Sequence, residues 1–489
     1  MTGNGVSQTG APDGFAQRVR SALAWRWGSQ LLAQLITWGA TIMVVRLLVP
    51  ADYGLFAMTQ VVVVALNFLN GWSFATSLIQ ADRVEKRQVG QVFALLLLMN
   101  GTLGLAQLLL APIAAAYYRE PAVADLLRVQ ALIFATTPFI ALPQALLSRR
   151  LEFRTQALAN LASAIIGALT ALGLAWFGFG VWALVYAPIL AFATRGLIMT
   201  ISLGALPLPV FDFRGAGKLI GFGGTLTLCQ LFWIIQSQSD IFIAGRSFET
   251  HQLGLYSEAL FLTLIVTGRF LPPVNEVAFP AYAELHKAGQ SLAPYFVRTL
   301  RTVLLVTAPI YIGLSLTAPE AILFVFGEKW IGMASLVAAV APAMPLMAVQ
   351  IVCSPATNAT GDARIYLATS IAGALLFVTA FLVGVGYGPE GLVRAWWFAA
   401  PALLAVTLAL TLPSVGVRPG TLAKAALPPL VACGFMAFAL QGARLLIPAD
   451  LHPGLMLAIL VPLGVASYVG MLLAFWREIV RESIAMLRR

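Results

Sequence analysis

Apolar stretches of about 20 residues recur along the chain from near residue 22 to near residue 476, and short polar or glycine-rich turns separate them. A transmembrane helix needs about 20 predominantly apolar residues to cross a hydrocarbon core about 30 Å thick. Inside lipid the backbone must satisfy its own hydrogen bonds, which favours helices joined by tight turns. The pattern predicts an all-α polytopic membrane protein with about fourteen spans, near 22–45, 54–79, 90–114, 125–147, 156–176, 180–202, 218–241, 254–282, 299–318, 331–352, 364–386, 390–412, 421–443 and 454–476.

A short motif occurs twice. The chain reads RLLVPADYGLF at 46–56 and RSFETHQLGLY at 246–256, and in both an arginine is followed, after seven residues, by Gly-Leu and an aromatic residue. Six predicted spans separate the copies, and an even number leaves both copies in the same orientation. Parallel repeats of this kind are common in transporters. We therefore expect six spans in each half and two further helices, with a disordered tail over 1–20, lobes over 21–205 and 215–413, helices over 420–478, and a second tail over 479–489.

Composition limits the functions that the chain can have. Only 10% of its residues are charged and 60% are hydrophobic, whereas a soluble domain carries about 25% charged residues. No long polar segment interrupts the spans, which leaves no room for a soluble catalytic domain. The opening MTGNGVSQTGAPDG lacks a basic region and an apolar core, so we do not expect a signal peptide. The net charge of +10 then indicates basic loops and anionic lipid rather than nucleic acid.

Basic residues concentrate in alternate loops, which predicts the orientation. Cytoplasmic loops of membrane proteins carry an excess of Lys and Arg. When the N-terminus is placed in the cytoplasm, that side receives most of the 30 basic residues, among them Arg87, Arg149, Arg195 and Arg418. The sparser side receives Arg46, Arg119, Arg128, Arg246, Lys329, Arg394 and Arg444. Both termini are therefore expected to be cytoplasmic.

The repeat motif also carries a family resemblance. RLLVPADYGLFAM, with SLIQ closing the following span, resembles the first hairpin of Wzx-type lipid-linked oligosaccharide flippases of the MATE-like (MOP) superfamily. Three further stretches agree in the family's order, SDIFIAGRSFETHQLGLYS at 239–257, FGEKW at 326–330 and ATGDAR at 359–364. One departure is Glu284, where the family pattern favours a small or basic residue.

The resemblance implies a fold and a function. The fold would be two six-helix MATE-like lobes around a central cavity, with two appended helices. The function would be movement of undecaprenyl-pyrophosphate-linked oligosaccharide from the cytoplasmic to the periplasmic leaflet of the bacterial inner membrane, for exopolysaccharide, O-antigen or capsule synthesis. The expected partners are this lipid-linked substrate, the bilayer, a polysaccharide polymerase and glycosyltransferases.

Arg269 is the main candidate for substrate binding. It lies midway through a long predicted span, where a charged side chain costs about 2.5–3.5 kcal/mol and should face a cavity or a partner. An arginine suits a pyrophosphate or an acidic sugar through bidentate hydrogen bonds. The alternative is a structural ion pair with Glu258 or Glu276. The matching span of the first half contains NFLNGWS, so Asn67 and Asn70 are expected to form a corresponding polar break.

Other polar residues inside or at the ends of spans are further candidates. In QSQSD, Gln236 could bond sugar hydroxyls, and Asp240 could bind a coupling cation or oppose an arginine; interhelical hydrogen bonds would explain both equally well. Arg26 suits either the cavity or the membrane interface. The two motif arginines, Arg46 and Arg246, suit either the cavity mouth or a helix C-terminus.

Several chemistries have no support in the sequence. RGAGKL at 214–219 lacks the glycine and the hydroxyl residue that a P-loop needs, and the three histidines are isolated. Cys229, Cys353 and Cys433 fit no metal or disulfide spacing and are expected to pack. We expect no cofactor, metal site or enzyme activity, while proton-, sodium- and potential-driven transport all fit.

Two other functions are alternatives to a flippase. They are a cation-coupled multidrug exporter of MATE-like architecture and an integral-membrane polyprenyl-sugar transferase. Tryptophans near span ends, including Trp330 and Trp396, are expected in an interfacial belt.

Overall fold

The structure is a computed structural model, which describes residues 13–80, 85–150, 152–204, 208–212, 224–448, 451–479 and 481. All secondary structure in these ranges is helical. The ends of both predicted tails, the RGAGKL stretch, and the side chains of Arg26 and Cys229 lie outside the described part. The chain divides into two units, one of Met1–Leu48 with Val62–Phe222 and the other of Val49–Val61 with Gly223–Arg489. The lobe boundaries expected from the repeat stay a prediction.

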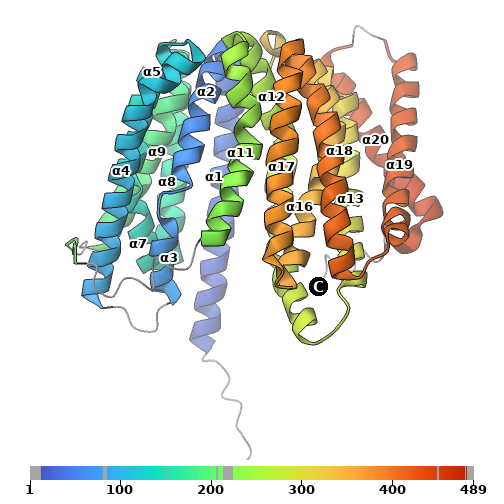
Figure 1. Ribbon diagram of the computed structural model, residues 1–489. Coiled ribbons are helices and arrows are strands. Elements are labelled where there is room, and N and C mark those ends of the chain that lie inside the picture. Colours follow the sequence, from blue (N-terminus) through green and yellow to red (C-terminus); the bar gives the residue numbers. More distant parts are fainter. Residues whose placement is uncertain are drawn as a thin grey trace, which may run out of the picture. The chain divides into compact units, whose positions relative to one another are not determined.

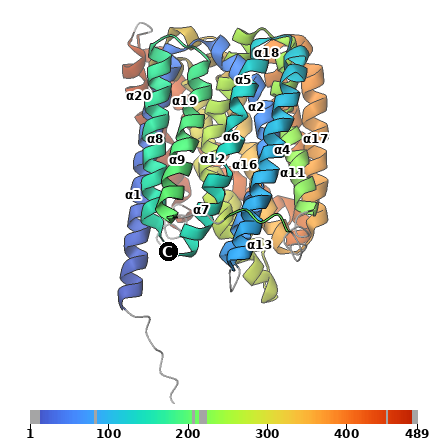
Figure 2. The same cartoon turned by 90° about the vertical axis from the view of Figure 1, so that its left-hand side faces the viewer.

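The first unit is built from α1 to α9, except for the first turns of α2. Figure 2 shows α1, α8 and α9 as neighbouring long helices, and each adjacent pair is in contact. The bounds of the helices are α1 Asp13–Leu47, α2 Pro50–Asn67, α3 Trp72–Gln80, α4 Lys86–Tyr118, α5 Ala122–Gln130, α6 Leu132–Thr136, α7 Pro138–Arg149, α8 Phe153–Trp176 and α9 Trp182–Leu203.

The second unit contains the first turns of α2 and all helices from α11 onward (Figure 1). The last two helices, α19 and α20, pack against α13 and α14 of this unit. The bounds are α11 Gly224–Ser247, α12 Thr250–Lys287, α13 Ala293–Leu316, α14 Ala318–Val325, α15 Met333–Val340, α16 Met344–Ala359, α17 Ala363–Gly384, α18 Gly388–Val415, α19 Pro419–Leu446 and α20 Pro453–Phe475, with short 3-10 turns at Glu328–Trp330, Ala341–Ala343 and Val385–Tyr387.

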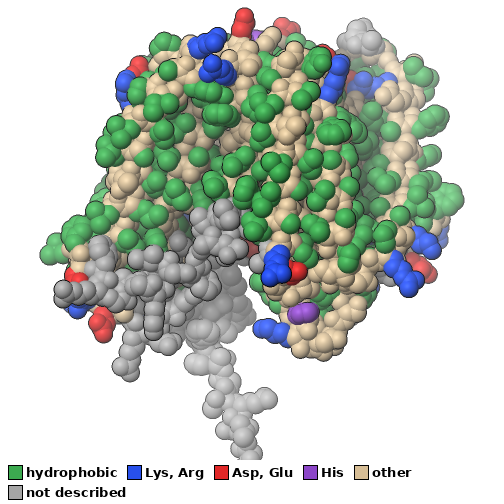
Figure 3. Space-filling view, viewed as in Figure 1, with side chains coloured by type: hydrophobic (Ala, Val, Ile, Leu, Met, Phe, Trp, Pro, Cys, Tyr) green, Lys and Arg blue, Asp and Glu red, His purple; other side chains and the backbone are tan. Residues whose placement is uncertain are grey.

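The helices have the length and composition that a membrane requires. Eleven stretches of the described residues are long and apolar enough to cross a bilayer, and one of them, Arg364–Val415, contains both α17 and α18. Figure 3 shows hydrophobic side chains along the sides of the helices, whereas charged side chains gather towards helix ends. The all-helical membrane architecture is therefore confirmed, and the exact number of about fourteen spans stays a prediction.

Glycine residues allow the tight turn between α17 and α18. The predicted turn YGPEG joins α17 to α18, and Gly388 there adopts a φ of 74°, which favours a residue without Cβ. A Cβ on Gly384 would lie 2.6 Å from the carbonyl oxygen of Gly391, so these two helix ends approach closely only because both residues are glycine. The hairpin of α17 and α18 therefore depends on small residues, as is common where helices pack in membranes.

The two halves differ at the predicted polar break. In the first half the break is confirmed, because α2 ends at Asn67 and α3 begins at Trp72. In the second half α12 is not interrupted at the corresponding place, because it continues through Pro272 and Pro273. The physical reason is the residue at the break itself: Gly71 has a φ of 76°, and its counterpart in the repeat is Leu271, whose Cβ disfavours that conformation. Proline itself requires a φ of about −65°, which is compatible with a helix, so Pro272 and Pro273 do not end α12.

The buried cysteines pack as expected. Cys433 lies in a cluster that joins α13, α19 and α20, together with Met436, Leu460 and Tyr468. Cys353 of α16 is also buried, in a cluster with Phe296 of α13. Both thiols are free. They act as small apolar side chains that fix the helices in place.

Candidate functional site

Arg269 lies midway along α12, and its side chain is exposed in the second unit. The ion pair considered above is wrong for both acids. Glu258 is buried about 16 Å away along the helix axis, at 1.5 Å per residue. Glu276 lies two turns after Arg269 on the same face, but neither it nor any other described residue pairs with Arg269 or bonds to its guanidinium. Within the described helices, an unpaired cation at this depth is expected to line a polar path rather than contact lipid.

A polar recess begins about two turns beyond Arg269. It has a volume of about 460 Å³ and lies between α12 and α16, where Asn275 and Glu276 face Ser354 and Asn358. Asn275 Oδ1 is buried and accepts no hydrogen bond there. Asn358 donates to the Ser354 hydroxyl at 3.3 Å. The α12 face that starts at Arg269 therefore reaches the Glu276 carboxylate two turns later, with the Asn275 amide beside it in the recess.

Gln236 lines a separate small cavity inside the second unit. The cavity has a volume of about 80 Å³ and is enclosed by α11, α16, α17 and α18. Its polar lining consists of amides and hydroxyls with no charged group, including Gln350, Tyr366, Thr407 and Thr411. The Gln236 carboxamide occupies the space that Gly373 leaves open. The cavity is large enough for a few water molecules, and the role of Gln236 in sugar binding stays a prediction.

Asp240 forms a buried hydrogen-bond chain rather than an ion pair. Tyr256 donates from its hydroxyl to Asp240 Oδ2 at 3.3 Å, and the Trp396 indole donates to the Tyr256 oxygen at 3.2 Å. The backbone N–H of Ile241 donates to Asp240 Oδ1 at 2.7 Å. In the ranges that the structure covers, no arginine pairs with Asp240, so opposition to an arginine is not observed. A buried carboxylate of this kind can bind a cation or a proton.

Asn67 and Asn70 have a structural role at the break in the first unit. Asn70 donates to Asn67 Oδ1 at 2.9 Å and accepts from the backbone N–H of Trp72 at 3.0 Å, which caps the start of α3. Asn100 of α4 donates to the Asn70 carbonyl oxygen at 2.9 Å. These bonds satisfy backbone groups that the interruption leaves without partners.

The repeat arginines lie at helix ends. Arg46 is in the last turn of α1 and Arg246 is in the last turn of α11, and both are exposed and engaged in contacts. A cation at a helix C-terminus is stabilised by the helix dipole. Arg26 belongs to α1, but its side chain lies outside the described residues. Within the second unit, the structure places Arg269, Gln236 and Asp240 in three different surroundings.

The expected place in the interfacial belt is wrong for two tryptophans. Trp330 is fully buried and contacts the Tyr53 ring edge-on, with 5.2 Å between ring centroids. Trp396 is buried against Phe377 and bonds to Tyr256. Span-end position alone suggests the belt, and tertiary packing covers both indoles instead.

The sequence alone does not single out Arg195. The sequence places it with the cytoplasmic loops, but Arg195 belongs to α9 and lines a cavity between α1, α7, α8 and α9 of the first unit.

The chain is similar in sequence to known proteins. Residues 43–335 match the family model described as polysaccharide biosynthesis protein. The chain belongs to the polysaccharide biosynthesis protein family. It resembles the teichuronic acid biosynthesis protein TuaB of Bacillus subtilis (strain 168), with 26% identity over 53% of this chain and 54% of that protein. It also resembles the succinoglycan biosynthesis transport protein ExoT of Rhizobium meliloti (strain 1021), with 25% identity over 58% of each chain.

Solved structures share the fold over most of the chain. The lipid II flippase MurJ, in an inward closed conformation, superimposes with a TM-score of 0.74 over 93% of this chain and 99% of that chain, at 14% identity. An inward-facing multidrug resistance MATE transporter of the MOP superfamily has a TM-score of 0.58 over 81% of this chain and 96% of that chain, at 18% identity. This member of the family therefore has the MurJ and MATE fold, whereas the alignment with curated relatives spans about half of their length.

Proposed function

We propose that this chain translocates undecaprenyl-pyrophosphate-linked oligosaccharide units from the cytoplasmic to the periplasmic leaflet of the bacterial inner membrane. The family match supports a role in surface polysaccharide synthesis, and the similar proteins include a transport protein and a lipid II flippase. A polysaccharide polymerase and glycosyltransferases would act beside it. The absence of a soluble domain in the sequence favours a transporter over a polyprenyl-sugar transferase.

The observation that carries this proposal is Arg269, whose guanidinium pairs with no other residue in the described part of the chain. Its guanidinium presents five donors in a fixed planar fork, which matches the oxygens of a pyrophosphate. Glu276 on the same face and Asn275 beside it line the recess and would meet sugar hydroxyls. The proposed movement is alternating access, in which the two halves expose this face first to one side of the membrane and then to the other. The prenyl tail would stay in lipid, because the hydrocarbon core of the bilayer is as apolar as the tail itself.

Cation coupling is part of the proposal. Asp240 is 3% exposed, and its carboxylate has partners only from one backbone N–H and one tyrosine hydroxyl among the described residues. A buried carboxylate with spare acceptor capacity suits a proton or a sodium ion. Multidrug exporters share this fold, so the fold alone does not separate the two transport functions. The exposed charge midway along α12, Arg269, is basic, which favours an anionic head group over a cationic drug.

The test is reconstitution of the full-length protein with a fluorescent lipid-linked disaccharide. Arg269→Ala is expected to lower the flipping rate at least tenfold, and Arg269→Lys to retain part of it, because lysine keeps the charge without the bidentate fork. Arg394→Ala is the matched control, since Arg394 is 77% exposed and lies 3.9 Å from Glu390. Flipping by Arg269→Ala at the wild-type rate would contradict the role of Arg269. Export of cationic drugs by the wild-type protein without flipping would favour the multidrug exporter.

A further inference from the structure

The first unit contains a polar cavity that none of the predicted site residues with a described side chain lines. It has a volume of about 370 Å³ and is enclosed by α1, α7, α8 and α9. Five side-chain amides and one guanidinium line it, together with hydroxyl groups: Gln30, Gln34, Gln144, Gln156, Asn160 and Arg195. The lining residues that the structure describes include no carboxylate. Polar groups inside a membrane bundle cost free energy, so they usually mark a functional site. The volume of this cavity lies within the range of small-molecule sites.

Arg195 is the only charged group among the described lining residues, and no described carboxylate neutralises its charge. It is the fourteenth of the 22 residues of α9, about 12 Å from the end of the helix at 1.5 Å per residue. One terminal nitrogen donates to Gln144 Oε1 at 2.7 Å. The Nε group is buried without a hydrogen-bond partner, and no carboxylate of the described residues pairs with Arg195. The neutral Gln144 amide orients the guanidinium but leaves its positive charge uncompensated.

A second polar group in the cavity also lacks a partner. Asn160 Oδ1 of α8 is buried and accepts no hydrogen bond. Nearby, Gln156 donates to the Ser148 hydroxyl at 3.0 Å, so that amide is held in place. Buried polar atoms are normally satisfied by protein, water or a ligand. The cavity therefore offers an oriented cation for an oxyanion, and beside it an amide that can pair with a hydroxyl.

We propose that this cavity binds one oxyanion of the transported head group, a carboxylate or phosphate that carries adjacent sugar hydroxyls. Arg195 binds the oxyanion, and Asn160 bonds a neighbouring hydroxyl. This inference rests on the proposed function for the origin of the ligand. It assigns the first unit an anion site of its own, separate from Arg269 of the second unit. An acidic sugar would supply a carboxylate, and the lipid carrier would supply a phosphate.

The test measures binding of soluble probes to the full-length protein in lipid nanodiscs. The probes are glucuronate, glucose 1-phosphate and glucose at millimolar concentrations, read by calorimetry. Glucuronate or glucose 1-phosphate is expected to bind at least tenfold more tightly than neutral glucose. Preference for glucuronate identifies an acidic sugar as the source, and preference for glucose 1-phosphate identifies the lipid-linked phosphate. Equal binding of all three probes, or binding of none, overturns the proposal.

Variants connect the binding to the cavity. Arg195→Gln is expected to abolish the preference for the anion, and Arg195→Lys to retain part of it. Asn160→Asp keeps the side-chain volume but places a carboxylate in the cavity, so it should weaken anion binding at least tenfold. Arg128→Gln is the matched control, because Arg128 of the same unit is exposed and pairs with Asp125 at 2.7 Å. Anion binding that is unchanged in both Arg195→Gln and Asn160→Asp overturns the proposal.

The outcomes separate this inference from the proposed function. If Arg269→Ala abolishes flipping while Arg195→Gln binds both anions as the wild type does, the cavity site is wrong and the flippase function stands. If Arg195 is required for anion binding but the wild type does not flip a lipid-linked sugar, the cavity site stands and the ligand has another origin. If the folded Arg195→Gln protein loses the anion preference and also flips more slowly, both are supported.

Discussion

Gly54 of α2 and Gly254 of α12 pack directly against each other's helix in the second unit. A Cβ on Gly54 would overlap the carbonyl oxygen of Thr250, and a Cβ on Gly254 would overlap the carbonyl oxygen of Pro50. These glycines occupy equivalent positions in the two copies of the repeat. The contact is therefore reciprocal, as a pseudo-twofold relation between the two copies requires. The motif marks a helix crossing in which the two backbones touch.

Alanine at either glycine should destabilise the protein. Because the atoms that a new Cβ would meet belong to the backbone, the helices must separate, and overpacking of this kind costs about 1–3 kcal/mol or more. Gly254→Ala should lower the unfolding temperature in detergent by several degrees. Gly434→Ala of α19 is the control, because a Cβ added there would meet no heavy atom within 4 Å and alanine favours a helix. Equal stability of the two variants would rule out the close crossing.

The ion pair between Arg444 and Glu320 should matter more than the exposed pair in the first unit. Arg444 of α19 lies 2.7 Å from Glu320 of α14, with side-chain exposures of 27% and 14%. Removing one partner leaves a partly buried charge, so Arg444→Met should cost about 3 kcal/mol of stability. Arg128→Met, whose Asp125 partner is 63% exposed, should cost about 1 kcal/mol or less.

A double variant checks whether the cost comes from the charge that is left behind. Glu320→Gln combined with Arg444→Met removes both charges, and it should recover part of the stability lost in Arg444→Met. The measurement is the unfolding temperature of each purified protein under the same conditions. A double variant as unstable as the sum of its two single variants would show that the pair does not couple α14 to α19.

The chain of Asp240, Tyr256 and Trp396 should behave as one unit. The equivalent positions of the first two residues in the other copy are Ala40 and Phe56, so both polar groups are replaced together there. Tyr256→Phe removes a donor from Asp240 and an acceptor from Trp396, at a cost of about 1–3 kcal/mol. Asp240→Ala with Tyr256→Phe reproduces the apolar pair and should be more stable than Tyr256→Phe alone.

The same double variant tests coupling. It should fold, but transport should no longer depend on a proton or sodium gradient, because the buried carboxylate is gone. The readout is the flipping rate in liposomes with and without an imposed gradient of each cation. Retained gradient dependence in the folded double variant would contradict the role of Asp240.

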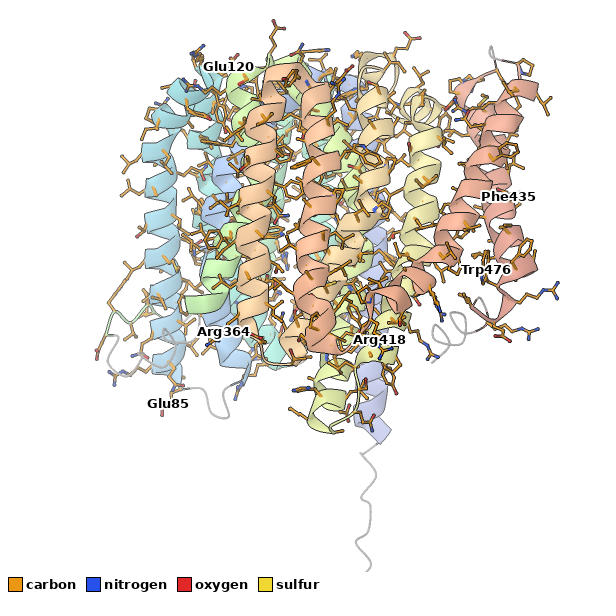
Figure 4. All side chains as sticks on the ribbon, turned by 45° about the vertical axis from the view of Figure 1, so that its right-hand side comes forward. Glu85, Glu120, Arg364, Arg418, Phe435 and Trp476 are labelled. Carbon is orange, nitrogen blue, oxygen red and sulfur yellow. The ribbon has the colours of Figure 1, made fainter. Side chains whose placement is uncertain are left out.

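The predicted orientation can be tested by cysteine labelling. Glu85 and Glu120 flank opposite ends of α4 (Figure 4). Arg364 and Arg418 lie at the starts of α17 and α19, on the side predicted to be cytoplasmic. A membrane-impermeant maleimide added to intact cells should label Glu120→Cys and leave Glu85→Cys and Arg418→Cys unlabelled. Cys353 and Cys433 are buried and should not contribute a background signal. The opposite labelling pattern would invert the topology.

The sequence determined the class of this protein because its main signals are local and periodic. Apolar stretches long enough to cross a bilayer are read directly from the chain, and in lipid each of them must satisfy its own backbone as a helix. The repeat at Arg46 and Arg246 and the break at Asn67–Trp72 are likewise visible in short stretches.

Tertiary structure decided which polar groups meet. Trp330 lies at a span end but is covered by Tyr53, and Asp240 contacts Tyr256 rather than an arginine. Arg195 looks like one more cytoplasmic cation in the sequence, yet α1, α7 and α8 surround it with amides from distant stretches. The rotation of a helix and the identity of its neighbours depend on packing between segments far apart in the chain, and hydropathy carries no information about that packing.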